Sequence, residues 1–193
     1  HLSSICYSMH SHLQWEVTSF TTRYSLTIMK SIHIPMIDVT LTNREYHECM
    51  VLGADTVKVC EMQGFKPRLE NKKQSRVEAN QLGFMAEFAV AKVFDLDKPG
   101  LNITSDGGAD LWWNDRSIDV KFTNRLDDGL LIFDSEDSFG ADLAVLVAKT
   151  SRKKVFRVLG WVDKDTFVSG NVSHDFGYGP RLVMKAGDLF PVE

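Results

Sequence analysis

The clearest pattern in this chain is an alternation of apolar and polar side chains through residues 118–122. Successive side chains of a β-strand point to opposite faces, so Asp119 and Lys121 share one face while the three apolar residues of the stretch share the other. A shorter apolar stretch, residues 111–113, comes just before it, and Asn114-Asp115 between the two favours a tight turn. The pattern therefore predicts a β-hairpin whose second strand has one buried face and one face carrying an acid and an amine.

Helical periodicity predicts two helices in the first half of the chain. The first begins after a cap at Thr40 or Thr42 and reaches about Met62, with Gly64 as its stop. The second covers about residues 71–94 and ends before a turn-rich break. Further elements are predicted as strands at residues 101–104, 130–133 (an edge strand), 142–149 and 155–162, and as a short helix capped by Asp163 that ends at residue 168. The strand at 142–149 is almost continuously apolar, as expected for a strand buried on both faces.

The hairpin turn brings two carboxylates together if it sets the register of the two strands. Counting outward from Asn114-Asp115, Asp110 falls opposite Asp119. Directly paired residues on one sheet face have Cβ atoms roughly 4.5–5.5 Å apart, at which distance two carboxylates repel each other. A divalent cation would offset that repulsion, and oxygen ligands are those that Mg²⁺ prefers. The alternative is an ordinary exposed strand face, where Asp119 and Lys121 meet only water.

A third acid, Glu87, stands in the apolar stripe of the second predicted helix. Its helical neighbours on that face are Gly83, Phe84, Val90, Ala91 and Phe94. Because burying an unpaired charge is costly, Glu87 either lies at the edge of the stripe beside a cation or reaches a site that favours negative charge. Glu78, nine residues earlier, falls about half a turn out of phase and is predicted to be solvated surface.

These four residues resemble the motif of the PD-(D/E)XK nuclease superfamily. The motif places a Glu on the first core helix, an Asp at the start of a strand and Asp-x-Lys on the next strand, and Glu87, Asp110, Asp119 and Lys121 match those positions. The resemblance covers roughly residues 71–162. The motif often has proline before its first aspartate, where this chain has alanine. The resemblance implies an α/β fold of the restriction-endonuclease-like type, with a mixed central sheet of about four to five strands flanked by helices.

The same resemblance implies a metal-dependent nuclease that hydrolyses phosphodiester bonds in DNA. Asp110, Asp119 and Glu87 would hold one or two Mg²⁺ ions, with Mn²⁺ as a substitute, and the main-chain carbonyl of Val120 would be a further ligand. Lys121 would orient the attacking water or stabilise charge in the transition state. The resemblance leaves open whether cutting is internal or from ends, whether RNA is also a substrate, and whether the enzyme is a homodimer.

Two other hypotheses stay open from the residues alone. One is a binding module of the same fold that has lost catalysis, although a decayed site would be expected to have lost one of the four residues. The other is an unrelated α/β interaction domain in which the four residues coincide by chance. Spatial convergence of the carboxylates separates the nuclease from the unrelated domain, because shared metal ligands need oxygens within about 2.0–2.6 Å of the ion.

Composition describes a globular chain without a membrane span. The 193 residues are 44% hydrophobic and 25% charged, and no apolar run approaches the ~20 residues of a membrane helix. Three cysteines, Cys6, Cys49 and Cys60, form a sparse and odd set that is typical of a reducing compartment, so a cytoplasmic protein is expected. Cys49 and Cys60 would lie about 16 Å apart along one helix, too far for a disulfide.

Residues 1–28 differ in composition from the remainder, being rich in Ser, Thr, His and aromatic residues. Met29-Lys30 would make a reasonable natural start. We therefore expect residues 1–28 to be an extension outside the core and residues 29–193 to form a single nuclease-like domain.

The net charge of −4 does not favour a nucleic-acid binder, but the basic residues are clustered. One run covers residues 66–76 and a second covers residues 149–157, at a predicted hairpin turn. The candidate phosphate-binding residues are Lys72, Lys73 and Arg76 in the first run and Arg152, Lys153 and Lys154 in the second. Each run taken alone is as well explained by solvated loop charge. Trp112 shares a face with Asp110 and could stack on a base, although partly buried packing is the more common role of such a residue.

Overall fold

The computed structural model describes residues 36–64, 74–101 and 109–192, all of which belong to one compact unit, Ile34–Glu193. Several predictions lie outside the described residues: the extension at 1–28, the part of the first basic run at 66–73, and the strand expected at 102–104. No helix of the described part is long and apolar enough to cross a membrane.

The larger of two sheets has five strands in the order β1-β6-β5-β3-β2. Its strands are β1 (Ile37–Thr40), β2 (Leu111–Trp113), β3 (Arg116–Thr123), β5 (Leu143–Lys149) and β6 (Val155–Asp163). The β3–β5 pair is parallel and the other pairs are antiparallel, so the sheet is mixed. The predicted α/β class and five-stranded mixed sheet are therefore confirmed. The β1 strand was not predicted, and Thr40, considered as a helix cap, is its last residue.

A second, three-stranded sheet was not predicted from the sequence. Its order is β4-β8-β7, with β4 (Leu130–Phe133), β7 (Val172–Asp175) and β8 (Pro180–Lys185). β4 lies at the edge, as predicted. A short helix, α3 (Lys164–Gly170), leads into it from an Asp163 cap, and a 3₁₀ turn, η1 (Ala186–Asp188), follows β8. β7 and β8 come after residue 162, where the resemblance to the nuclease motif ends.

Side-chain caps decide where the two long helices begin. α1 (Asn43–Met62) starts after Thr42, whose hydroxyl accepts from the Glu45 N–H in a capping box. α2 (Arg76–Val93) starts after Ser75, whose hydroxyl accepts from the Glu78 N–H. The predicted start of α2 near residue 71 is therefore about five residues too early, because the helix begins where a side chain can cap its first N–H groups.

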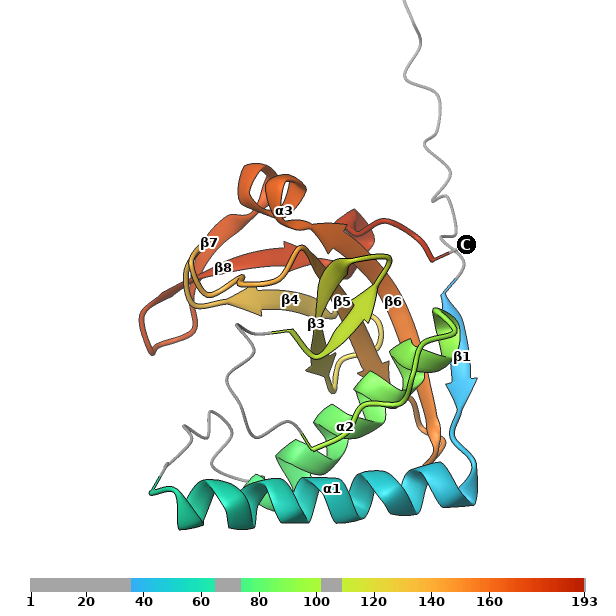
Figure 1. Cartoon of the computed structure of the whole chain (residues 1–193). Coiled ribbons are helices and arrows are strands. Elements are labelled where there is room, and N and C mark those ends of the chain that lie inside the picture. Colours follow the sequence, from blue (N-terminus) through green and yellow to red (C-terminus); the bar gives the residue numbers. More distant parts are fainter. Residues whose placement is uncertain (1–35, 65–73, 102–108, 193) are drawn as a thin grey trace, which may run out of the picture. The chain divides into compact units, whose positions relative to one another are not determined.

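Helices and the smaller sheet lie on opposite faces of the five-stranded sheet (Figure 1), and its inner strands β5 and β6 are mostly buried. α2 packs against one face and α1 packs against α2, while the smaller sheet and α3 cover the other face. β5 shows both environments: Val145 and Val147 face α2, and Ala144 and Leu146 face the smaller sheet. This confirms the prediction of a strand buried on both sides.

The two long helices approach each other closely at Gly53. A Cβ atom at this position would lie 2.5 Å from the Gln81 backbone nitrogen of α2, which is too close for any side chain. Gly53 therefore allows α1 to lie directly on the helix that carries Glu87.

Candidate active site

The hairpin of β2 and β3 has the register that the sequence predicts. Asn114 and Asp115 adopt φ values of 48° and 62°, the left-handed conformation that a two-residue hairpin turn requires. The pairs Leu111–Ile118, Trp112–Ser117 and Trp113–Arg116 face each other. One step further, the Asp110 N–H donates to the carbonyl of Ile118, the residue that Leu111 already faces, at 2.8 Å, so the regular pairing ends at Leu111. The expected pair of Asp110 and Asp119 is therefore not a ladder pair, and the two carboxylates meet through a hydrogen bond between their side chains.

Asp110 is held against the backbone of β3. Its Oδ2 atom accepts a hydrogen bond of 2.7 Å from the N–H of Val120, the residue between Asp119 and Lys121. Asp110 itself is exposed, because it precedes the edge strand β2. This bond fixes an accessible carboxylate beside the Asp-x-Lys segment.

Asp119 is the more deeply buried carboxylate, with 5% of its surface exposed. Its Oδ2 atom lies 2.7 Å from the Lys121 Nζ atom. Burial raises the pKa of Asp119, while the charge of Lys121 and hydrogen bonds with Lys121 and Asp110 act in the opposite direction. The side chains of Asp110, Asp119 and Lys121 therefore meet at one point of the sheet.

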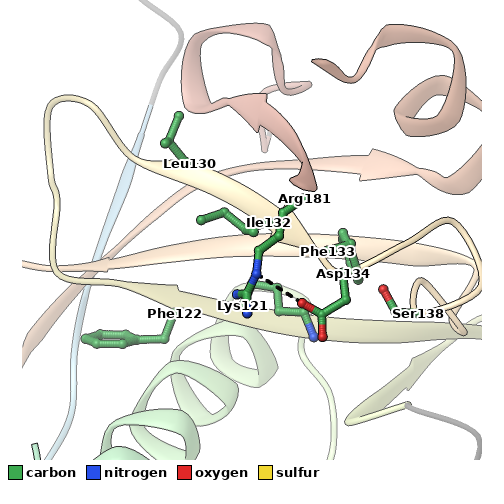
Figure 2. A pocket seen from close by; sticks show the side chains of 8 residues that line it. All are labelled: Lys121, Phe122, Leu130, Ile132, Phe133, Asp134, Ser138 and Arg181. Carbon is green, nitrogen blue, oxygen red and sulfur yellow. Dashed lines mark ion pairs between the residues drawn. The ribbon is translucent and has the colours of Figure 1, made fainter. Parts of the chain in front are cut away.

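Lys121 reaches from this pair toward the smaller sheet. Its ammonium group lies 5.0 Å from the centre of the Phe133 ring, close enough for a cation–π interaction. Its side chain is 37% exposed and lines a pocket between β3, β4 and β8 (Figure 2). Asp119 and Lys121 thus lie on the face of the sheet opposite α2, and the apolar residues of β3 face α2, as predicted.

Glu87 lies on α2, on the side where α1 is close. It is half-buried, and its charge adds to burial in raising the pKa of the Cys49 thiol of α1 to about 12. Within the described ranges, no three His, Cys, Asp or Glu side chains come close enough to hold a metal ion. The structure therefore brings Asp110 and Asp119 together but does not add Glu87 to them, and the ligand roles of Glu87 and of the Val120 carbonyl stay predictions.

The second basic run forms the turn between β5 and β6, as predicted, but its charges already have partners. Arg152 and Arg157 both bind Asp38 of β1, at 2.8 and 2.6 Å. The hydrogen bond from Arg157 is the main reason that the pKa of Asp38 is lowered.

The two lysines of this turn contact α1. Lys153 and Lys154 lie 5.5 and 5.7 Å from the centre of the Tyr46 ring, and Lys154 also donates to the Asn43 side chain. Thr150 comes six residues after Ala144, the partner of Asp119, so the turn lies roughly 20 Å along the sheet from Asp119. The turn does not border the carboxylate pair. Of the first run, Arg76 is the first residue of α2, and Lys72 and Lys73 lie outside the described residues.

Trp112 is 61% exposed, so the prediction that it packs into the structure is wrong. It belongs to the edge strand β2 and lines an open pocket of about 630 Å³ together with Asp110 and residues 95–101. Its neighbour Trp113 points the other way and packs edge-on against Phe94 at 5.6 Å. An exposed indole therefore stands beside the accessible carboxylate.

Two further charged residues near Lys121 were missed in the sequence. Arg181 of β8 and Asp134, just after β4, form an ion pair of 3.2 Å in the pocket that Lys121 lines (Figure 2). The only signal was the apolar stretch at residues 182–184, which predicts a strand but not its partner.

No protein-family model, curated protein or solved structure matches this chain.

Proposed function

We propose that this protein is a divalent-metal-dependent nuclease with a restriction-endonuclease-like fold, and that it hydrolyses phosphodiester bonds in DNA. The observation that carries the proposal is the contact of Asp119 of β3 with two groups, the carboxylate of Asp110 just before β2 and the ammonium group of Lys121. The side chains of Asp110 and Asp119 share a hydrogen bond, and the Lys121 Nζ atom lies 2.7 Å from Asp119.

The two aspartates suit a hard cation. Both offer carboxylate oxygens, the ligands of Mg²⁺ and Mn²⁺, and they are close enough to share a hydrogen bond. The raised pKa of Asp119 means that its charged form is disfavoured where it lies, and a cation beside it would offset that cost. Asp110 and Asp119 would hold the metal, with Glu87 and the Val120 carbonyl as additional candidates. When bound, such a metal lowers the pKa of an attacking water and neutralises charge on the phosphoryl group.

Lys121 has a separate role in this proposal. Its ammonium group is anchored by Asp119 on one side and by the Phe133 ring on the other, at the mouth of a pocket. A cation fixed in this way can hold the attacking water and stabilise negative charge that grows on the phosphate oxygens.

Further features of the chain suit a DNA-cutting protein. The exposed Trp112 next to Asp110 suits stacking on a base. Cys49 and Cys60 are free thiols, in keeping with a reducing cytoplasm. A homodimer would present one such site to each strand of a duplex.

The test is cleavage of plasmid, linear duplex and single-stranded DNA with Mg²⁺, with Mn²⁺ and with a chelator. Asp119→Ala and Lys121→Ala should each lower the rate by roughly 10²–10³-fold or more while leaving the folded state intact. Lys149→Ala, on the exposed end of β5, is the matched control and should cut at the wild-type rate. Equal cleavage by Lys121→Ala would remove the lysine from the mechanism. DNA binding without metal-dependent cutting would favour the non-catalytic module instead.

A further inference from the structure

A pocket of about 340 Å³ lies between the two sheets, directly beside the Asp119–Lys121 pair. Lys121 enters it from β3 and Arg181 enters it from β8, so two cations share one small cavity (Figure 2). The carboxylate of Asp134 also lines this pocket and pairs with Arg181, so a bound anion would be attracted to both cations and would compete with Asp134 for Arg181.

The guanidinium of Arg181 lines the pocket and pairs there with a carboxylate that water also reaches. Its side chain is only 12% exposed, whereas its partner Asp134 is 65% exposed. An ion pair with a carboxylate so open to water contributes little stability. A planar guanidinium, by contrast, binds phosphate through two parallel hydrogen bonds.

Most of the other side chains that line the pocket are apolar, and Asp134 and Ser138 add polar atoms. Phe122, Leu130 and Ile132 line it, next to the cations. Cations and apolar side chains in one pocket match the two parts of a nucleotide, its phosphate and its base. The volume is at the lower end of the range for small-ligand pockets, which gives room for one nucleotide and excludes a duplex.

We propose that this pocket holds a single nucleotide of the substrate next to the bond that is cut, with its phosphate between Lys121 and Arg181. The inference rests on the proposed function, since Lys121 serves both. A base stacked in a duplex cannot enter such a pocket, so the nucleotide must be unpaired. The preferred substrate is therefore single-stranded DNA or the unpaired region of a branched or frayed duplex.

Binding without cleavage tests the pocket directly. Titration calorimetry in the absence of metal should show that thymidine 5′-monophosphate binds more tightly than inorganic phosphate or thymidine. Only the nucleotide contacts both the cations and the apolar side chains of the pocket. Arg181→Gln should weaken the nucleotide on the order of ten- to hundred-fold, the usual effect of losing a charge-assisted hydrogen bond. Arg125→Gln removes the guanidinium of an exposed Arg–Asp pair outside the pocket and is the matched control, with unchanged binding expected.

A second variant keeps the test decisive if Arg181→Gln unfolds, which its melting temperature would reveal. Ile132→Glu places a carboxylate at a half-buried position of the same pocket and should abolish nucleotide binding by charge repulsion. Ile132→Leu keeps the apolar wall and should bind like the wild type.

Cleavage assays on the same variants separate the two proposals. Higher KM for single-stranded DNA in Arg181→Gln and Ile132→Glu, with cutting retained, supports the pocket. If DNA is cut in a Lys121-dependent way but neither variant changes KM or nucleotide binding, the pocket proposal fails and the nuclease stands. If the nucleotide binds and Arg181→Gln loses it while no DNA is ever cut, the nuclease fails and the pocket remains a nucleotide site. Equal affinity for phosphate and nucleotide would overturn the role of the apolar wall.

Discussion

Replacing Asp119 by asparagine should make the metal-free protein more stable, although it removes a partner from an ion pair. Asp119 is 5% exposed, and burial is the largest influence on its pKa, which is raised. Asparagine has the same shape, carries no charge, and can still accept from Lys121. The substitution therefore removes the cost of burying a charge and keeps the packing.

The expected magnitude follows from two opposing contributions. A buried carboxylate loses several kcal/mol of hydration, and a charge-assisted hydrogen bond such as that to Lys121 returns about 1.5–3 kcal/mol. Because the pKa of Asp119 stays raised in spite of Lys121, the lost hydration free energy is larger than the gain from the hydrogen bond. After the substitution, Lys121 remains 37% exposed and keeps water around its ammonium group. We expect Asp119→Asn to gain about 1 kcal/mol, which corresponds to about 2–4 °C in Tm for a chain of this size.

The gain should depend on pH in a definite direction. Because the pKa of Asp119 is raised in the folded state, folding favours its protonated form. The stability that protonation of Asp119 gives is fully present below pH 3.8, the ordinary pKa of an Asp. It is lost as the pH rises through the pKa of Asp119 in the folded protein. The free energies of unfolding of the wild type and of Asp119→Asn should therefore be closest at acidic pH, and the wild type should become the less stable of the two toward pH 7. Chemical denaturation across this range, with a chelator present, measures the difference.

Metal and a matched variant complete the assay. Mg²⁺ should stabilise the wild type, by about 2.7 kcal/mol at a hundred times its Kd, and should stabilise Asp119→Asn far less, which reverses their order. Asp110→Asn changes an exposed carboxylate and should alter metal-free stability by less than about 0.5 kcal/mol. Lower stability of Asp119→Asn without metal at pH 7 would refute the reasoning, because it would show that the ion pair outweighs the burial of the charge.

Three further outcomes are expected. Gly53→Ala should lower stability by about 1–3 kcal/mol in thermal unfolding, because its Cβ would lie 2.5 Å from the backbone of α2; Gly83→Ala, whose Cβ would meet its nearest neighbour at 3.9 Å, should not destabilise. The Cys49 thiol is buried and its pKa is raised to about 12, so in the native protein it should resist iodoacetamide at pH 8 and react only after unfolding, as followed by mass spectrometry. Charge reversal at Lys153 and Lys154 should leave turnover unchanged at saturating DNA. The slope of log affinity against log salt concentration should become smaller by about 0.9 for each DNA phosphate that the protein no longer neutralises. An unchanged slope would show that neither lysine contacts DNA.

The sequence alone determined those features that depend on neighbouring residues. The turn at Asn114 and Asp115 needs left-handed backbone, which these residues tolerate, and a two-residue turn sets the hairpin register without help from other elements. That register brings Asp110, just before β2, beside Asp119 and Val120 of β3. The sequence likewise limited the cap of α1 to Thr40 or Thr42, because a cap acts within three residues, and the structure shows that it is Thr42.

Only the tertiary structure decided which distant segments meet. Arg181 lies beside Asp134 because β8 pairs with β4, and no local pattern names the partner of a strand. The pocket beside Lys121 follows from that pairing, since the second sheet closes over the face of β3 that carries Lys121. The exposure of Trp112 has the same origin: the alternation assigns it to a face, but only the packing of whole elements determines whether that face is covered.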